Sequence, residues 1–396
     1  MTGTPLAASA TYATSAISAT PATPLRAEAT IDLAAVRSST ARLVEVARGS
    51  QVMAVVKADG YGHGMLECAR AVLDAGAEWL GVSSLSEALQ LRAAGVTVPV
   101  LAWLAAPGDR VDEAVAAGID LSASADWALE EAAAAARLCG RPARVHLKAD
   151  TGLSRAGATP AEWPDLVAAG TQHVADGTIV PVGVWSHFAL ADAPASPTVA
   201  AQVRRFREAI ELAERGGWVP EVRHIANSAA TLALPEAHFD LVRPGIACYG
   251  LSPGPEVGRA SDLGLSPAMT LRAPVALTKR VAAGSGVSYG HRYITPRETT
   301  LALVPLGYAD GVPRAASNTG QVWLGGRRRT IAGTVCMDQF VLDAEDDPVQ
   351  AGDEAILFGP GDQGEPTAQD WADALGTINY EIVTRIGARV PRQYVG

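Results

Sequence analysis

Two lysines, two arginines and a histidine each lie at or just beyond the end of a short apolar segment of this sequence: Lys57, Lys148, Arg155, His187 and Arg243. A lysine at the end of a buried strand is costly unless it is neutralised or used covalently. A lysine amine can also form a Schiff base with a carbonyl compound. These residue types predict a site that takes an anionic ligand and reacts with it through an amine.

Small polar residues and glycine follow the last two of these segments. Asn227 and Ser228 supply an amide and a hydroxyl, while Gly245 and Ile246 supply backbone N–H groups that a ligand can approach closely. In a barrel of parallel strands, the loops after the last two strands are the usual phosphate site. Cations, a phosphate site and a reactive lysine together predict pyridoxal 5′-phosphate (PLP) as cofactor.

The elements that must position these residues are strands alternating with helices. Ala- and Leu-rich segments such as 84–94, 125–138 and 198–215 have helical periodicity and separate the apolar runs. Strand–helix alternation implies parallel strands, and eight repeats predict an α/β fold with a (β/α)₈ TIM-type barrel. The eight apolar runs are Val52–Val56, Trp79–Val82, Val98–Trp103, Ile119–Leu121, Ala143–Leu147, Ile179–Trp185, Val222–Ile225 and Leu241–Val242.

The texture changes after about Asp262, where apolar runs are separated by Gly, Pro and Asp turns. This pattern predicts a mainly β second domain, with one helix over Thr367–Leu375. We therefore divide the chain into a disordered Ala-, Thr-, Ser- and Pro-rich tail (1–25), a PLP-binding barrel (26–262) and a C-terminal β domain (263–396). The predicted strands of the last domain are Ala273–Val281, Thr299–Pro305, Arg329–Val335 and Glu354–Phe358.

Composition and charge narrow the classes of molecule that this protein is expected to bind. The 396 residues carry a formal net charge of −10, which disfavours nucleic acid and anionic membranes. No apolar run is long enough for a membrane helix, and the N-terminal segment lacks the charged and apolar blocks of a signal peptide. The four cysteines are widely spaced, so we expect no metal site and no disulfide framework, and a cytoplasmic location.

At this point the sequence resembles the alanine racemase family. The resemblance begins near residue 27 and runs to the end of the chain, so it covers both predicted domains. Its longest motif is Val55-Val56-Lys57-Ala58-Asp59-Gly60-Tyr61-Gly62-His63-Gly64, which is similar to the PLP-lysine signature of that family. Further matching motifs are Lys148–Gly152, Ser186–Phe188, Arg243–Gly245, Val287–Gly290, Gly307–Gly311, Cys336–Asp338 and Asn379–Glu381.

The resemblance implies roles for residues around the cofactor. Lys57 would carry PLP as a Schiff base, and Arg243, held by His187, would face the pyridine nitrogen. A guanidinium has no acceptor, so it can only donate to that nitrogen. Arg155 would contact the cofactor's phenolic oxygen and the substrate carboxylate. The remaining implied cofactor contacts, mainly to the phosphate, are Tyr61, Asn227, Ser228, Gly245, Ile246 and Tyr380.

The resemblance also implies alanine racemisation by two bases on opposite faces of the substrate, Lys57 and Tyr289, supplying D-alanine for peptidoglycan precursors. Met337 would bind the substrate carboxylate through its backbone N–H. Tyr308 and Asp310 would line the corridor to the site. In the family, the segments with Tyr289 and Met337 reach the partner's barrel, so we expect a homodimer with composite active sites.

Lys148 is a candidate for carbamylation, since a lysine amine that burial and neighbouring cations keep neutral can take up carbon dioxide. The resulting anion could hold Arg155 in place. The alternative is an ordinary lysine that forms an ion pair with a carboxylate such as Asp150.

Three other functions remain open at this level. One is a racemase with a broader preference or a preference for serine. Another is a barrel decarboxylase, although such enzymes generally pair the pyridine nitrogen with a carboxylate and this sequence offers Arg243. The third is a PLP-binding protein without robust catalysis, which would resemble the barrel alone.

Overall fold

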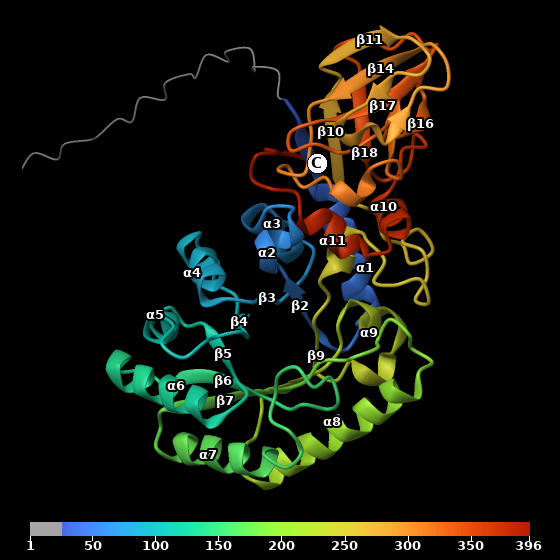
Figure 1. The fold of residues 1–396 in the computed structure, drawn as a ribbon. Helices are drawn as coiled ribbons and strands as arrows, with labels where there is room; N and C mark the ends of the chain where they lie inside the picture. The colour runs from blue at the N-terminus through green and yellow to red at the C-terminus, as the bar shows by residue number, and fades with distance from the viewer. Residues whose placement is uncertain (1–25) are drawn as a thin grey trace, which may run out of the picture.

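The structure, a computed structural model, describes residues 26–396. The predicted tail, 1–25, lies outside the described residues. A barrel and a mainly β domain follow one another along the chain, and the second domain projects from one side of the barrel (Figure 1).

Eight parallel strands form the barrel, and each overlaps one of the eight predicted apolar runs. Their order in the sheet is β8-β7-β6-β5-β4-β3-β2-β9, so chain neighbours lie side by side. The predicted (β/α)₈ architecture is confirmed. The strands are β2 (Gln51–Val55), β3 (Trp79–Val82), β4 (Val100–Ala102), β5 (Asp120–Ala123), β6 (Ala143–Lys148), β7 (Ile179–Trp185), β8 (Val222–His224) and β9 (Leu241–Val242).

The barrel closes in two different ways at its last strand. A regular ladder joins β9 to β2, with Gln51 opposite Leu241. Between β8 and β9 there are single backbone hydrogen bonds instead, from Asp240 to Arg223 at 3.1 Å and from Arg243 to Ala226 at 2.8 Å. The second of these bonds fixes the backbone of Arg243 at the end of the strand where the predicted site lies.

Helices cover the outside of the barrel (Figure 1). The clearest start is that of α4, where Ser84 and Glu87 form a capping box that satisfies backbone N–H groups. The helices of this half are α1 (Leu33–Val46), α2 (Lys57–Tyr61), α3 (Met65–Asp74), α4 (Leu85–Ala93), α5 (Val111–Ala116), α6 (Asp126–Cys139), α7 (Trp163–Ala175), α8 (Pro197–Arg215) and α9 (Ser228–Ala233).

The second domain is built on a six-stranded sheet and a three-stranded sheet. The predicted helix is present as α10 (Ala368–Leu375), with Thr367 as its N-cap, and α11 (Asn379–Thr384) follows it. The strands are β10 (Met269–Pro274), β11 (Leu277–Val281), β12 (Gly286–Val287), β13 (Tyr293–Ile294), β14 (Thr299–Val304), β15 (Gln321–Leu324), β16 (Arg327–Thr330), β17 (Phe340–Glu345), β18 (Glu354–Phe358) and β19 (Arg392–Val395).

Two predicted strands of this domain were wrong in extent. The run Ala273–Val281 divides into β10 and β11, which belong to different sheets, so the chain crosses between sheets just after Pro274. The run Arg329–Val335 keeps strand structure only to Thr330, and Gly333 then takes a φ of 85° that no strand continues through. Apolar continuity does not reveal either break.

The first strand of the described chain, β1 (Glu28–Asp32), lies in the sheet of the second domain. It pairs antiparallel with β10 and parallel with β19. We did not expect this, because the predicted barrel begins at residue 26. A strand this short carries no sign of the domain it joins, because the two strands that pair with it, β10 and β19, lie far along the chain. We keep the boundary near residue 262 as a proposal.

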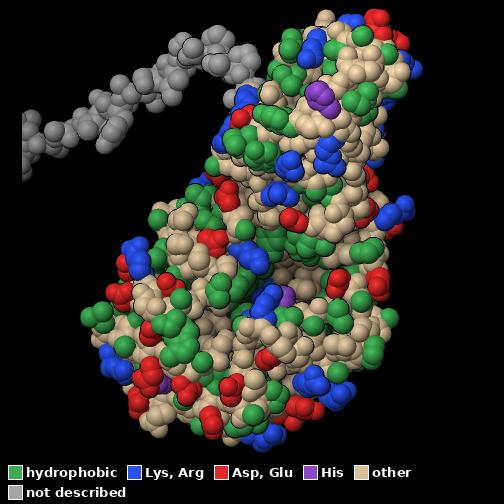
Figure 2. Space-filling view, viewed as in Figure 1, with side chains coloured by type: hydrophobic (Ala, Val, Ile, Leu, Met, Phe, Trp, Pro, Cys, Tyr) green, Lys and Arg blue, Asp and Glu red, His purple; other side chains and the backbone are tan. Residues whose placement is uncertain are grey.

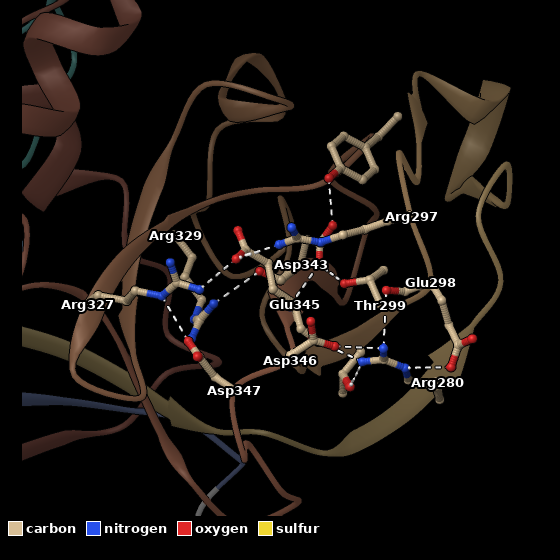
Figure 3. Close-up of polar contacts among 12 residues, drawn as sticks. Arg280, Arg297, Glu298, Thr299, Arg327, Arg329, Asp343, Glu345, Asp346 and Asp347 are labelled. Atoms are coloured by element: carbon tan, nitrogen blue, oxygen red, sulfur yellow. Dashed lines mark hydrogen bonds and ion pairs between the residues drawn. The ribbon is translucent and has the colours of Figure 1, made fainter.

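A cluster of ion pairs lies on the three-stranded sheet, on β16 of the six-stranded sheet and on the loops beside them (Figure 3). Arg280 contacts Glu298 and Asp346, and Arg327 contacts Glu345 and Asp347. Within residues 26–396 no helix is long and apolar enough to cross a bilayer.

Candidate active site

A cavity of about 520 Å³ opens at the carboxyl ends of the barrel strands. Figure 2 shows this region hollowed, with Lys or Arg and His side chains inside the hollow. The structure brings eleven of the predicted residues to its lining: Lys57, Tyr61, Lys148, Arg155, His187, Asn227, Ser228, Arg243, Gly245, Ile246 and Tyr380.

Lys57 begins a turn with an uncommon backbone. Ala58, Asp59 and Tyr61 have φ values of 54°, 52° and 53°, in the left-handed region that costs a non-glycine residue roughly 1–2 kcal/mol. Carboxylates hold the turn: Glu87 accepts from the backbone N–H of Ala58 at 2.7 Å, and Asp59 accepts from that of Met65 at 2.8 Å. The same Glu87 closes the capping box of α4, so a neighbouring helix anchors the backbone that carries Lys57.

Burial and neighbouring charge favour the neutral form of both lysines. Burial, followed by the charge of Arg155, lowers the pKa of Lys57. Burial, followed by the charges of Arg243 and Arg155, lowers the pKa of Lys148 to about 7. The Lys148 Nζ lies 4.0 Å from the centre of the Trp185 ring. A lowered pKa makes each amine a better candidate nucleophile or base than an ordinary lysine.

The alternative ion pair between Lys148 and Asp150 does not form. Instead, one oxygen of Asp150 accepts from the backbone N–H groups of Gly152, Leu153 and Ser154, at 2.9, 3.0 and 3.1 Å. Asp150 therefore shapes the loop that leads to Arg155. Among the described residues no ion pair joins Lys148 to a carboxylate.

Arg243 is buried and fixed at both terminal nitrogens. Nη1 lies 2.9 Å from Nδ1 of His224, and Nη2 donates to the carbonyl of Ser186 at 2.8 Å and lies 3.3 Å from Nδ1 of His187. The predicted contact with His187 is thus present. Among the described residues, Nε of Arg243 has no hydrogen-bond partner and no carboxylate contacts the guanidinium. It can therefore donate to a ligand in the cavity.

Four residues form a cradle on the other side of the cavity: Tyr61, Ser228, Gly245 and Tyr380. The Ser228 hydroxyl accepts from the backbone N–H of Gly245 at 2.8 Å, which leaves its own proton for a ligand. A Cβ at Gly245 would lie 2.2 Å from the Tyr61 hydroxyl, so glycine is required there. The rings of Tyr61 and Tyr380 are 6.2 Å apart, and neither hydroxyl finds a partner in residues 26–396.

These features fit PLP. The cradle offers hydroxyl donors for a phosphate, the unpaired Nε of Arg243 suits the pyridine nitrogen, and Lys57 supplies the amine. Lys148 and Arg155 add positive charge that the described part of the chain does not balance. The donor set thus matches an anionic aromatic aldehyde better than a metal ion.

Tyr380 is the predicted residue of the second domain that reaches this cavity, whereas Tyr289, Met337, Tyr308 and Asp310 do not line it in the single chain. The side chains of Tyr289 and Met337 are 74% and 53% exposed, and that of Tyr308 is 43% exposed. Asp310 is buried instead, where it contacts Arg26 at 3.1 Å and Arg389 at 3.3 Å. For these four residues the expected roles, a base, a carboxylate contact and a corridor lining, stay predictions.

Several residues at or behind the site were missed by the sequence analysis. Trp103 and Trp185 line the cavity, and Glu87 anchors the lysine turn. Deeper in the barrel lie His146 and His224. The signal for His146 was available, because it precedes Lys148 by two positions and so points to the same face of its strand.

Comparison with known proteins defines the class. The chain matches the family description "Alanine racemase, N-terminal domain" over residues 31–253 and "Alanine racemase, C-terminal domain" over residues 268–394. It is 69% identical to the alanine racemase of Frankia casuarinae over 371 residues, 94% of this chain and 97% of that protein.

Solved structures agree with this. Alanine racemase from Streptomyces lavendulae superposes with a TM-score of 0.94 at 56% identity, covering 95% of this chain and 98% of that one. The enzyme of Streptomyces coelicolor A3(2) gives a TM-score of 0.93 at 59% identity, covering 94% and 98%. The fold is that of an amino-acid isomerase. The chain belongs to the alanine racemase family.

Proposed function

We propose that this protein interconverts L-alanine and D-alanine with PLP bound in the barrel cavity. The observation that carries the proposal is the group of basic side chains around Lys57 without carboxylate partners among the described residues, which faces a cradle of unpartnered hydroxyls. PLP, when bound, withdraws electrons from the amino acid and makes its α-proton labile. Net reaction requires only that one proton leaves the α-carbon on one face and another arrives on the opposite face.

Tyr61, Ser228 and Tyr380, with the backbone of Gly245 and Ile246, would hold the phosphate. Asn227 begins the same turn, where its side chain accepts from the backbone N–H of Ala230 at 3.1 Å and so fixes the position of Ser228. Burial raises the pKa of Tyr61, so its hydroxyl keeps its proton and can donate it to a phosphate oxygen.

Arg243 would donate to the pyridine nitrogen through Nε. Burial lowers the pKa of Arg243 to about 9, which still leaves it protonated at neutral pH. The pKa of His187 lies well below its ordinary value because of burial and the charge of Arg243, so His187 accepts from Arg243 as a neutral ring. The pyridine nitrogen would therefore receive a hydrogen bond but not a proton.

Lys57 and Tyr289 would be the two proton carriers. Lys57 would hold the cofactor covalently between turnovers, and with substrate bound its amine would take or return the α-proton. Tyr289 would work on the opposite face and exchange roles with Lys57 in the reverse direction.

In a single chain the side chain of Tyr289 stays largely exposed. We therefore infer a homodimer in which Tyr289 completes the active site in the partner's barrel. Met337 would accompany it and bind the substrate carboxylate through its backbone N–H, opposite Arg155. Tyr308 and Asp310 would line the corridor through which alanine enters. The exposure of Tyr289, Met337 and Tyr308 supports an interface at this face.

Lys148 would carry a carbamate. A neutral amine between Arg243 and Arg155 gains most by becoming an anion, and carbon dioxide converts it to one with release of a proton. The anion would then hold Arg155 against the cofactor oxygen and the substrate carboxylate. The D-alanine formed would be used for peptidoglycan precursors. We place the protein in the cytoplasm.

A coupled assay tests the proposed function. D-amino-acid oxidase reports product formed from L-alanine, L-serine and L-lysine, and we expect alanine to be preferred. Removal of PLP with hydroxylamine should abolish turnover, and added PLP should restore it. Turnover that survives cofactor removal would contradict PLP dependence, whereas a preference for serine or lysine would contradict the substrate assignment alone.

A further inference from the structure

A chain of hydrogen bonds runs through the barrel interior behind Arg243. From Nη1 of Arg243 it passes to Nδ1 of His224 at 2.9 Å, and from Nε2 of His224 to Nδ1 of His146 at 2.9 Å. It ends at Asp120, whose carboxylate lies 3.3 Å from Nε2 of His146. We call these four residues the relay. All are buried, with the two histidines 0% exposed.

The chemistry of arginine fixes the direction of every bond in the relay. A guanidinium has only N–H donors, so Nδ1 of His224 must accept. In a neutral ring the proton then sits on Nε2 of His224, which must donate to Nδ1 of His146. The same reasoning puts the His146 proton on Nε2, where it is donated to the Asp120 carboxylate. Each donor points from Arg243 toward Asp120, an alignment in which successive bonds strengthen one another.

The barrel wall leaves room for this arrangement and for little else. A Cβ at Gly183 would lie 2.1 Å from Nδ1 of His146, so the ring occupies the space of a missing side chain. Trp185 stacks on His224 with ring centres 5.7 Å apart and planes at 8°. Below them the barrel is filled by an apolar layer that includes Met53, Leu101, Val182, Val222 and Leu241. The apolar side chains of that layer offer the two histidine rings no alternative hydrogen-bond partner.

The far end of the relay is anchored at the opposite rim. Asp120 forms an ion pair with Arg144 at 2.8 Å, and Arg144 also contacts Glu221 at 3.3 Å. Among the described residues no carboxylate contacts Arg243 directly. Asp120 is thus the negative charge that hydrogen bonds connect to this buried cation, across the length of the barrel.

We propose that Asp120, His146 and His224 are positioning residues for Arg243. They commit Nη1 to the barrel interior and prevent the guanidinium from turning, which leaves Nε free for an acceptor in the cavity. A ring that donates onward to a carboxylate is also a better acceptor, so the bond from Arg243 is tightened. This rests on the proposed function, in which that acceptor is the pyridine nitrogen.

Side-chain tautomers give a test that needs no turnover. In the PLP-loaded protein labelled with ¹⁵N in histidine, we expect His146 and His224 to be neutral and protonated at Nε2. Signals are assigned by single His→Gln variants. A proton on Nδ1 of either ring, or a doubly protonated His224, would overturn the relay. This result stands whether or not the protein racemises alanine.

Variants test whether the relay matters for the reaction. His146→Leu removes the central ring, and Gly183→Ala pushes that ring aside without deleting a polar group. We expect kcat to fall about 10- to 100-fold, the usual size for a lost outer hydrogen-bond partner, with the KM for alanine within about threefold. The visible absorbance of the bound cofactor should also shift, since Arg243 would move relative to the pyridine nitrogen.

Matched controls separate positioning from a structural role. His173→Leu removes another buried histidine, on α7, and Gly170→Ala crowds the Trp218 ring, whose nearest atom would lie 3.0 Å from the new Cβ. Both should lower the melting temperature comparably and leave kcat and absorbance unchanged. Relay variants that behave like these controls would overturn the proposal. If the relay variants do not fold, the tautomers decide, and inactive wild-type protein would count against the proposed function alone.

Discussion

Two groups of basic side chains in this molecule differ in what balances their charge. On the second domain, Arg297 contacts Glu345 at 2.8 Å and Arg329 contacts Asp347, like the other arginines of that cluster (Figure 3). At the barrel mouth, Lys57, Lys148 and Arg243 have no carboxylate partner in the described residues. The first group is neutralised by the chain itself, whereas the second requires an anion from outside.

A cavity alone would not have separated the two regions, since one of about 310 Å³ also opens at the outer cluster. The two regions differ in whether their hydrogen-bond donors already have carboxylate partners. In the outer cluster the arginine donors already meet carboxylates, so little binding capacity is left for a ligand. In the barrel mouth, burial favours neutral amines at Lys57 and Lys148, and the donors that face the cavity stay free for a bound anion. Function is therefore expected where the ion pairs are missing.

The largest effect should follow loss of the one reactive amine. The chain has three lysines, Lys57, Lys148 and Lys279, of which Lys279 is exposed on β11. Lys57→Ala removes both the covalent link and a base, so racemisation should fall by about 10³-fold or more. Borohydride reduction followed by peptide mass spectrometry should label Lys57 in the wild type and nothing in the variant. Labelling of Lys279→Ala should be unchanged, and a label on Lys148 would contradict the assignment.

Tyr289 should come next, and it tests whether one chain holds a complete site. Tyr289→Phe should reduce racemisation by about 10²- to 10⁴-fold while PLP binding and stability persist, because the ring is largely exposed. Solvent deuterium should still enter one enantiomer faster than the other.

Mixing subunits sharpens that test. If each site combines Lys57 of one chain with Tyr289 of the other, Lys57→Ala and Tyr289→Phe subunits together form one intact site per mixed dimer. Random exchange should then restore about a quarter of wild-type activity. No recovery after exchange would mean that both residues act within the same chain.

The two regions also differ in how far the sequence predicted them. The barrel could be predicted because each strand is one uninterrupted apolar run, and residues at strand ends must converge. Eleven site residues followed from that rule and from family motifs. The second domain was predicted less well, because its strands switch sheets at Pro274 and β1 joins it from the other end of the chain. Such pairings depend on contacts distant in sequence.

Within the site, the unpredicted residues act through other residues. Glu87 holds the backbone of the lysine turn at Ala58, and His224 and His146 lie behind Arg243. His146 stands two residues before Lys148, but its bond to His224 appears only once the barrel is closed. The motifs that identify Arg243 and His187 therefore do not identify the relay behind them.

A pair of buried arginines compares the two regions directly. Arg243 and Arg329 are 4% and 5% exposed. Arg329→Gln loses bonds to Asp347 and to the carbonyl of Leu324, so the free energy of unfolding should fall by about 1–3 kcal/mol with activity unchanged. Arg243→Gln should instead lower kcat about 10- to 100-fold, with a smaller loss of stability in cofactor-free protein. Urea unfolding measures the stability and the coupled assay the activity of both variants. Loss of activity in Arg329→Gln with activity kept in Arg243→Gln would contradict the distinction between the two groups of basic side chains.

The smallest effect concerns the pH dependence of stability. Lys148 has a pKa of about 7 in the folded protein and an ordinary pKa of 10.5 when unfolded. Between these values the unfolded chain binds more protons, so the free energy of unfolding should rise with pH, and below pH 7 the full cost of the buried charge remains. In carbon dioxide-free buffer, subtracting the Lys148→Met curve isolates this contribution from that of Lys57. An identical slope in both proteins would contradict the lowered pKa.

Bicarbonate then distinguishes a bare amine from a carbamate. Above pH 7 the neutral amine can react, and an anion between Arg243 and Arg155 would balance charge that the chain leaves unpaired. Added bicarbonate should stabilise the wild type but not Lys148→Met, and ¹³C-labelled bicarbonate should give a carbamate signal. Lys148→Ala should be less active and partly rescued by chloride or small carboxylates, which can take the same place. Without a bicarbonate effect, Lys148 would be a neutral lysine, and the barrel mouth would keep one cation fewer than its sequence suggests.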